Sequence, residues 1–386
     1  MKDQEQYRSP EQARRAYRRL SERIELGEDS QNAVIQKVAD MVIIDKLVKP
    51  SEMTFHPGNR ELLVEYDRQP GKLYRIHKHA LSQLCIKDKV RIPAEWVNRQ
   101  VQNENKEPWR PEMVAGVFTT VYKNTDFRSK QVDDPKFLHR VVGDQLRGFL
   151  SRRFNRHIAS GRLLRAFLAV CAECGAVPMD GTATDVKVAL KCALPHVFEP
   201  VPNEFVAFGI EWSNSDFGAG RMQVSMCMWS IWGDRFTVLE NGIFRRHIGS
   251  VIEEADVEIS DATATKEADA QASAIRDTVI EQLSTTNVDK LLKIIAMAHK
   301  EELPWDKIKG QLTKFLPQEG IKTLKEALEN EIVDLPPVRT NADQEKVPTK
   351  WWASQALSWL ASRTNDPEKK LDLEKASSAF LEVKDA

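Results

Sequence analysis

Apolar residues near the start of the chain recur at the spacing of an amphipathic helix. The residues that share one helical face are Ala13, Tyr17, Leu20 and Ile24, and arginines cover much of the remaining surface. Ser9 suits the N-cap and Pro10 the first helical position, while glycine often follows the last turn. The sequence therefore predicts a first helix that ends near Gly27 and a second helix over residues 33–47.

Short β-prone runs separated by turn residues predict strands in the middle of the chain. The clearest runs cover residues 62–66, 72–76, 186–191, 205–212, 222–229 and 236–239. Residues 113–124 are β-branched and aromatic and are also predicted as a strand, whereas residues 133–153 are predicted as mixed helical. From residue 274 onward the spacing of apolar residues predicts helices over 274–283, 288–298, 305–315 and 321–330, an extended linker, and a last helical pair that carries several tryptophans.

These patterns predict an α+β protein in three parts. Residues 1–255 are expected to form a basic, mixed body with an antiparallel sheet. Residues 256–274 are acidic and rich in Ala, Thr and Ser, and are expected to be an exposed segment or hinge. Residues 275–386 are expected to form a helical C-terminal region, whose tryptophans are candidates for contacts in a homo-oligomer.

Composition narrows the class of protein. The 386 residues are 41% hydrophobic and 29% charged, as in ordinary globular proteins. No stretch approaches the roughly 20 apolar residues that cross a bilayer, and the N-terminus lacks the apolar core of a secretion signal. Five cysteines, an odd number, favour reduced thiols. We therefore expect a cytoplasmic protein without a membrane partner.

Charge is unevenly distributed along the chain. The whole chain has a net charge of −1, but from residue 251 onward 18 Lys and Arg face 26 Asp and Glu, which leaves +7 on the first 250 residues. The densest positive run covers residues 136–165, with eight Lys and Arg against the single acid Asp144 and phenylalanines interleaved. A basic front part is typical of a protein with an anionic partner, although an acidic tail that only solvates helices would give the same balance.

The basic run predicts contact with nucleic acid, because arginine forks bind phosphates and aromatic faces stack on bases. The predicted phosphate contacts are Arg147, Arg152, Arg153, Arg156, Arg245 and Arg246, and the predicted stacking residues are Trp212 and Phe217. The alternative is that the phenylalanines belong to the core and that the arginines pair with carboxylates of the same chain or of a neighbouring subunit.

Metal and catalytic chemistry have weaker sequence signals. Cys171, Cys174, Cys192 and His196 have a spacing compatible with zinc, but the first two lie in a helical run whose apolar face would bury them. Carboxylates near the predicted sheet could hold magnesium for phosphodiester cleavage, as in a nuclease; they are Glu211, Asp216, Asp234, Glu240, Glu253 and Glu254. Neither a phosphate-binding glycine loop nor a nucleophile motif occurs, so we predict no cofactor and favour a non-enzymatic protein.

Several segments in order resemble the phage- and plasmid-borne family known as domain of unknown function 932. The similar segments are KLYRIHKHALSQLCIKDKVRIPAEWV (72–97), QLRGFLSRRFNRHIASGRLLRAF (145–167), FGIEWSNSDFGAGRMQVSM (208–226), LENGIFRRH (239–247), WWASQALSWLASR (351–363) and LEKASSAFL (373–381). Asp216 stands where the family pattern has Glu, and the cysteine expected before Asn241 is missing. The resemblance implies a protein of mobile-element origin that acts in phage or plasmid DNA metabolism, and it supplies no catalytic residues.

The combined expectation is a non-enzymatic protein that binds or anneals single-stranded DNA in recombination or replication and works as a homo-oligomer. The alternatives are a protein-interaction or structural factor, for example an inhibitor of host defence, and a metal-dependent nuclease.

Overall fold

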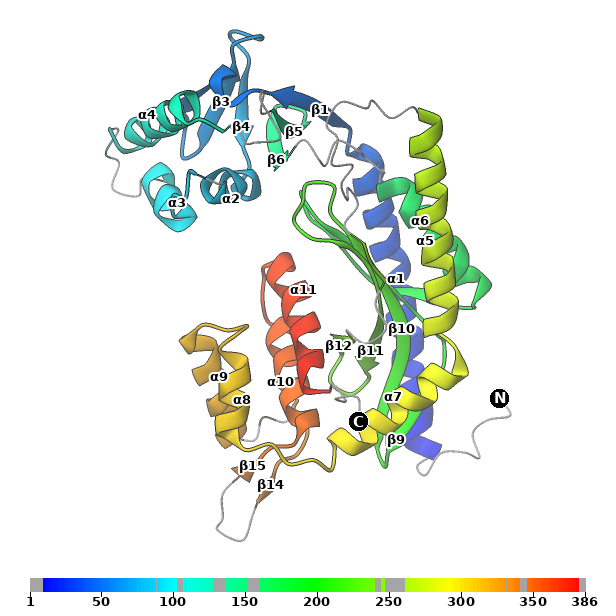
Figure 1. Ribbon diagram of the computed structural model, residues 1–386. Coiled ribbons are helices and arrows are strands. Elements are labelled where there is room, and N and C mark those ends of the chain that lie inside the picture. Colours follow the sequence, from blue (N-terminus) through cyan, green and yellow to red (C-terminus); the bar gives the residue numbers. More distant parts are fainter. Residues whose placement is uncertain are drawn as a thin grey trace.

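Two β-sheets organise the chain, and helices pack against both in the computed structural model (Figure 1). The structure describes residues 10–87, 89–102, 107, 109–127, 136–151, 160–239, 244–246, 261–330, 332, 334–340 and 346–381. Within these ranges, only the backbone is described for residues 244–246, 261, 263, 264, 339 and 340. The observed class is α+β, which confirms the prediction.

The N-terminal sheet has the strand order β1-β5-β6-β4-β3-β2 and is antiparallel except between β4 and β6. Its strands are β1 (Ile43–Val48), β2 (Met53–Pro57), β3 (Leu62–Tyr66), β4 (Leu73–Ile76), β5 (Phe137–Val142) and β6 (Gln145–Ser151), with a 3-10 turn η2 (Pro50–Glu52) before β2. Helices α2 (Lys78–Ile86), α3 (Ala94–Gln102) and α4 (Trp109–Asn124) share one apolar core with this sheet. The rings of Phe55, Phe118 and Tyr122 lie 5.4–6.2 Å apart in that core.

The central sheet has the order β12-β11-β10-β8-β7, with β9 beside β10 and β13 beside β11. Its strands are β7 (Val177–Ala183), β8 (Val188–Ala193), β9 (Phe198–Val201), β10 (Glu204–Asn214), β11 (Met222–Ser230), β12 (Arg235–Val238) and β13 (Phe244–Arg246). The pairings are antiparallel, with irregularities in β7 and at the start of β10. Long strands β10 and β11 are buried along nearly their whole length, because helices cover both faces of this sheet.

The two faces of the central sheet meet different helices. One face carries Leu190, Ile210, Trp212 and Val224, which pack on α5 (Ser160–Glu173) and α6 (Asp261–Gln282). Further along that face, the apolar side chains meet α7 (Thr285–Ala298). The sheet curls around α10 (Lys350–Ser362) and α11 (Pro367–Ala376) on its concave side (Figure 1).

The remaining helices complete the C-terminal region. They are α8 (Trp305–Leu312), α9 (Gln318–Glu329) and the 3-10 turn η4 (Ser377–Phe380), with a short hairpin of β14 (Arg339–Thr340) and β15 (Lys346–Val347). Helices α8, α9 and α10 share an apolar cluster that includes Leu312, Leu324 and Trp352. The helices predicted after residue 274 are thus confirmed, and the predicted linker contains the hairpin.

Helix α1 (Pro10–Asp40) continues through Gly27, so the predicted stop at this glycine is wrong. A Cβ built on Gly27 would lie 2.2 Å from the carbonyl oxygen of Pro178, so glycine is required for the close approach of α1 to β7. On the facing strand, a Cβ on Gly181 would lie 2.9 Å from the carbonyl oxygen of Ser30. Residues 43–47, predicted as the end of a second helix, instead belong to the edge strand β1 (Ile43–Val48).

Two further predictions differ from the structure, at residues 113–124 and 137–151. Residues 113–124 belong to α4, where Val114, Phe118 and Tyr122 repeat every four positions and are buried, so helical period outweighs β-branched composition. Residues 137–151 form β5 and β6 instead of a helix, because strands buried on both faces lose the alternation that identifies a strand. Residues 261–274, which belong to the predicted exposed segment or hinge, are the first part of α6, which packs on α5; most of the described side chains there are exposed or half-buried.

Candidate functional site

Three described arginines of the predicted basic run are held by acceptors of their own chain, whereas a fourth, Arg165, is exposed. Arg140 is 5% exposed, pairs with Asp45 at 3.2 Å and donates to the carbonyl oxygen of Asp216. Arg147 donates to the carbonyl oxygen of Asp185 at 3.0 Å and lies 3.4 Å from its carboxylate. Arg162 pairs with Asp269 on α6. The alternative of internal pairing therefore describes these three residues. The guanidinium of Arg147, a predicted phosphate contact, is already bonded to Asp185.

The other predicted phosphate contacts are described partly or not at all. Arg152, Arg153 and Arg156 lie outside the described residues. Arg245 and Arg246 lie on β13, where their backbones pair with Gln223 and Met222 of β11. Their predicted contacts with phosphate remain predictions.

Both predicted stacking residues belong to the core, which corrects the hypothesis that their rings stack on bases. Trp212 is 0% exposed, and its ring stacks on Phe167 with centroids 6.3 Å apart. Phe217 is 1% exposed, and its carbonyl oxygen accepts hydrogen bonds from His79 and Gln83 on α2. The turn that carries Phe217 is therefore held against α2, and neither ring offers a free face.

The predicted zinc spacing does not build a metal site. Cys171 and Cys192 are buried beside each other, and a hydrogen bond between their thiols, together with burial, raises the pKa of Cys171. His196 instead meets the Tyr17 hydroxyl at 3.1 Å. Among the described residues, no group of three or more His, Cys, Asp or Glu is arranged to hold a metal ion.

The predicted nuclease carboxylates are dispersed. Asp216 accepts a hydrogen bond from Ser160 at 2.6 Å at the start of α5, and Asp234 accepts one from the Trp229 indole at 2.9 Å. Glu211 lies in the charged network described next. Glu240, Glu253 and Glu254 fall outside the described residues.

A network of buried charges crosses the concave face of the central sheet. The strand register places Asp180, Lys191, Glu211 and Ser225 directly opposite one another on β7, β8, β10 and β11. We call the charged residues of this row and their partners on α11 the buried charge cluster: Asp180, Lys191, Glu211, Lys370, Glu374 and Lys375. Helix α11 thus closes over a polar row instead of an apolar one.

Lys191 lies at the centre of the buried charge cluster. Its Nζ is 2.8 Å from Glu374 and 3.5 Å from both Asp180 and Glu211, and the residue is 2% exposed. Burial alone would lower the pKa of Lys191, but the three surrounding carboxylates outweigh burial and raise it. One ammonium therefore neutralises carboxylates from two strands and one helix.

The carboxylates of the cluster respond differently to burial. Burial raises the pKa of Glu374 despite its contact with Lys191. For Asp180, burial is outweighed by Lys191, Lys370 and Arg23, so its pKa is lowered. Glu211 is fully buried and lies 3.4 Å from Lys375, yet neither of its oxygens accepts a hydrogen bond from a described residue.

Sequence reasoning missed this cluster, although one signal was present. Lys191 and Glu211 are charged residues inside otherwise apolar strands, and such residues are almost never buried without partners. Strand alternation predicts that each side chain lies on one face of its strand. The register between the strands and the contact with Glu374 depend on distant segments, so local patterns do not predict them.

The exposed positive charge of the described residues is densest on the N-terminal half of α1. Arg14, Arg15, Arg18 and Arg19 are exposed there, and we call them the α1 basic ridge. Arg15 pairs with Glu11, a surface pair in which both side chains are more than two-thirds exposed. Such exposed pairs contribute little, so Arg15 can exchange its carboxylate partner for an anion.

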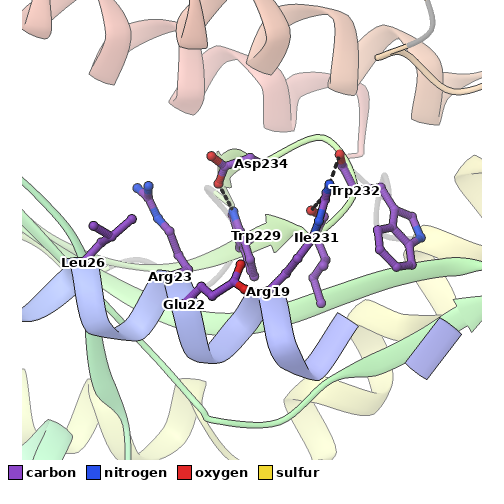
Figure 2. Close-up of a pocket in the computed structure, with 8 residues that line it drawn as sticks. All are labelled: Arg19, Glu22, Arg23, Leu26, Trp229, Ile231, Trp232 and Asp234. Atoms are coloured by element: carbon purple, nitrogen blue, oxygen red, sulfur yellow. Dashed lines mark hydrogen bonds between the residues drawn. The ribbon is translucent and has the colours of Figure 1, made fainter. Parts of the chain in front are cut away.

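A pocket of about 310 Å³ lies between α1 and the turn that joins β11 to β12 (Figure 2). The lining residues are Arg19, Glu22, Arg23, Leu26, Trp229, Ile231, Trp232 and Asp234. Arg19 donates to the carbonyl oxygens of Ile231 and Trp232, both at 3.1 Å, and its guanidinium lies 5.4 Å from the centre of the Trp232 ring. The α1 basic ridge therefore leads directly to a pocket with a partly exposed tryptophan at its rim.

The pocket is connected to the buried charge cluster by one residue. Arg23 lines the pocket and also pairs with Asp180 at 3.1 Å. Its guanidinium lies 5.3 Å from the centre of the Phe236 ring. The conformation of this pocket wall is therefore tied to the charges under α11.

In the described parts of the chain, no helix is both long and apolar enough to cross a membrane. No protein-family model, no curated protein and no solved structure matches the chain.

Proposed function

We propose that this protein binds single-stranded nucleic acid, without catalysing a reaction, through the α1 basic ridge and the rim of the adjoining pocket. The observation that carries the proposal is the exposed set of four arginines that ends beside the partly exposed Trp232. Cations along a surface together with an aromatic ring are the features that sequence-independent strand binding requires. The site differs from the one predicted over residues 136–165, where Arg140, Arg147 and Arg162 are already paired.

The geometry of a helix favours contact with successive phosphates. Arg14 and Arg18, like Arg15 and Arg19, are four positions apart and therefore lie about 6 Å apart along one side of the helix. Arginine binds a phosphate oxygen pair with its planar fork, so each guanidinium serves as one contact. Ala13, Ala16 and Leu20 bury the opposite side of α1 against the sheet, which holds the ridge outward.

The wider role of the proposed site rests on the family resemblance. It favours strand binding or annealing in phage or plasmid recombination or replication, by a cytoplasmic homo-oligomer.

The test is fluorescence anisotropy of the full chain with a labelled oligothymidine at several salt concentrations. Four phosphate contacts predict a log–log slope of about −3, since each contact on a single strand contributes about −0.7. The variant Arg15→Gln/Arg18→Gln removes two contacts and is expected to reduce that slope by about 1.4.

The matched control is Lys322→Gln/Lys325→Gln on α9, which removes two exposed cations that also lie in i,i+4 pairs. It is expected to bind like the wild type. Absence of binding at low salt, or equal loss of affinity in the control, would contradict the proposal. Equal affinity for polyglutamate would instead favour a factor that docks on acidic proteins.

A further inference from the structure

The pocket beside the α1 basic ridge is lined by opposite charges. Arg19 and Arg23 are matched by Glu22 and Asp234, so the pocket has no net charge to attract a phosphate. Its apolar surface comes from Leu26, Trp229 and Ile231. A neutral, flat group that offers both donors and acceptors along its edge fits these surroundings better than an anion.

Two of the polar groups retain unused bonding capacity. The Asp234 carboxylate accepts the Trp229 indole proton with Oδ1, while no described residue donates to Oδ2. Arg23 contacts Asp180 with Nη2, and its Nη1 makes no hydrogen bond with a described residue, while 21% of the side chain stays exposed. Figure 2 shows the Arg23 guanidinium and the Asp234 carboxylate extending to the same side of α1, with the Trp229 indole beneath Asp234.

The turn holds Asp234 in this position at a conformational cost. Asp234 has φ +47°, in the left-handed region that Asp and Asn tolerate better than other non-glycine residues. Strained backbone of this kind persists where the surrounding structure requires it and is found often at ligand sites. Here it places Asp234 in the lining of the pocket.

We propose that this pocket takes a guanine base. Guanine presents N1–H and the 2-amino group side by side as donors, which suits the Asp234 carboxylate. It presents O6 and N7 as acceptors, and arginine is the commonest partner for this pair. Adenine has no N1–H donor and a 6-amino group in place of O6, so it can make only a single hydrogen bond with the carboxylate and a single one with the arginine.

The volume agrees with this assignment. A pocket of about 310 Å³ is at the small end of the range for small-molecule sites and suits a single base instead of a whole dinucleotide. A strand held on the α1 basic ridge would have its bases near this pocket, because Arg19 belongs to both. The inference rests on the proposed function in this respect, but the source of the guanine, a strand or a free nucleotide, is tested separately.

The experiment uses the full chain and oligothymidines that carry one central replacement base. The bases are guanine, hypoxanthine, which lacks the 2-amino donor, 7-deazaguanine, which lacks the N7 acceptor, and adenine. Guanine is expected to bind about fivefold or more tightly than adenine, because a good bidentate pair discriminates by at least about that factor. Hypoxanthine and 7-deazaguanine are expected to lose part of this preference.

The variant Asp234→Asn tests the carboxylate with little structural change. Asparagine tolerates the same backbone conformation and still accepts the Trp229 indole proton, but it loses the charge that favours two donors. We expect Asp234→Asn to abolish the preference for guanine over adenine. Arg15→Gln/Arg18→Gln should do the opposite, with weaker binding to all strands and an intact preference.

A parallel titration with dGMP and dAMP, followed by tryptophan fluorescence, separates the two proposals. Oligothymidine binding without any guanine preference overturns the guanine pocket and leaves strand binding standing. Selective dGMP binding that Asp234→Asn removes, without strand binding, supports the pocket and overturns the proposed function. Equal affinity for dGMP and dAMP counts against the pocket in either case.

Discussion

The substitution Lys191→Met is expected to destabilise the fold strongly, because it leaves three buried carboxylates without their shared ammonium. The side chain of methionine is similar in length, so the main change is the loss of charge. Lys191 Nζ lies 2.8 Å from Glu374 and 3.5 Å from Asp180 and Glu211. At an effective dielectric constant of about 20, each contact corresponds to roughly 5 kcal/mol of Coulomb attraction.

Most of that attraction offsets the cost of removing the charges from water. The net effect of breaking a buried pair by removing one partner is about 3–5 kcal/mol, and we expect the same range for the free energy of unfolding of Lys191→Met. The carboxylates that lose Lys191 acquire raised pKa values, so the folded variant takes up protons more readily than its unfolded chain. The loss in free energy of unfolding relative to the wild type should therefore be larger at pH 8 than at pH 5.

The assay is urea denaturation of the full chain, followed by tryptophan fluorescence at both pH values. Lys322→Met, at a side chain that is 78% exposed, is the matched control and should change stability by less than about 1 kcal/mol. The double variant Lys191→Met/Glu374→Gln should regain part of the loss, since it removes one of the unpaired charges. A Lys191→Met protein as stable as wild type at pH 8 would refute the reasoning.

Two further predictions concern the neighbourhood of the sheet. Burial raises the pKa of Glu204 to about 7, so its contribution to the free energy of unfolding is full below the unfolded pKa near 4.5 and is lost as pH rises through about 7. In urea denaturations at a series of pH values, Glu204→Gln should remove this fall in the free energy of unfolding. The same pH dependence in the variant and the wild type would contradict the prediction. Gly27→Ala should cost about 1–3 kcal/mol in the same assay, because its Cβ would lie 2.2 Å from the Pro178 carbonyl oxygen. The matched control is Gly116→Ala in α4, where no heavy atom lies within 4 Å of the added Cβ, and it should raise the free energy of unfolding by about 0.5–1 kcal/mol. Equal effects at both sites would rule out the steric explanation.

The buried charge cluster also bears on how the chain is assembled. Asp180 and Lys191 lie in the middle of the sequence, whereas Glu374 and Lys375 lie near its end. A C-terminal helix with an apolar inner face could slide along a sheet at little cost, but ion pairs at fixed positions specify one register. We therefore expect the cluster to determine where α11 docks more than how tightly it docks.

Local pattern was sufficient for much of the secondary structure. Residues 188–193, 204–214 and 222–230 are strands, and the helices after residue 274 lie close to their predicted positions, since their period is carried by neighbouring residues. The same reasoning failed at Gly27, where the glycine is explained by the close approach of α1 to β7. It also failed at residues 113–124, where the helical period of the buried residues outweighs the β-branched composition.

The candidate site on α1 was not predicted from the sequence. Residues 136–165 were the strongest positive signal, yet Arg140, Arg147 and Arg162 meet acceptors on other elements. The arginines of α1 form a shorter positive run in the sequence. The pocket beside them also depends on a turn more than 200 positions away.

The sequence by itself determined the α+β class, the basic character of the first 250 residues and the positions of most strands and helices. Only the tertiary structure decided which charges are buried, which are paired and which face water. The physical reason is that periodicity is a property of adjacent residues, whereas the energy of a charge depends on its solvent and on partners from distant segments, as Lys191 between Asp180 and Glu374 shows.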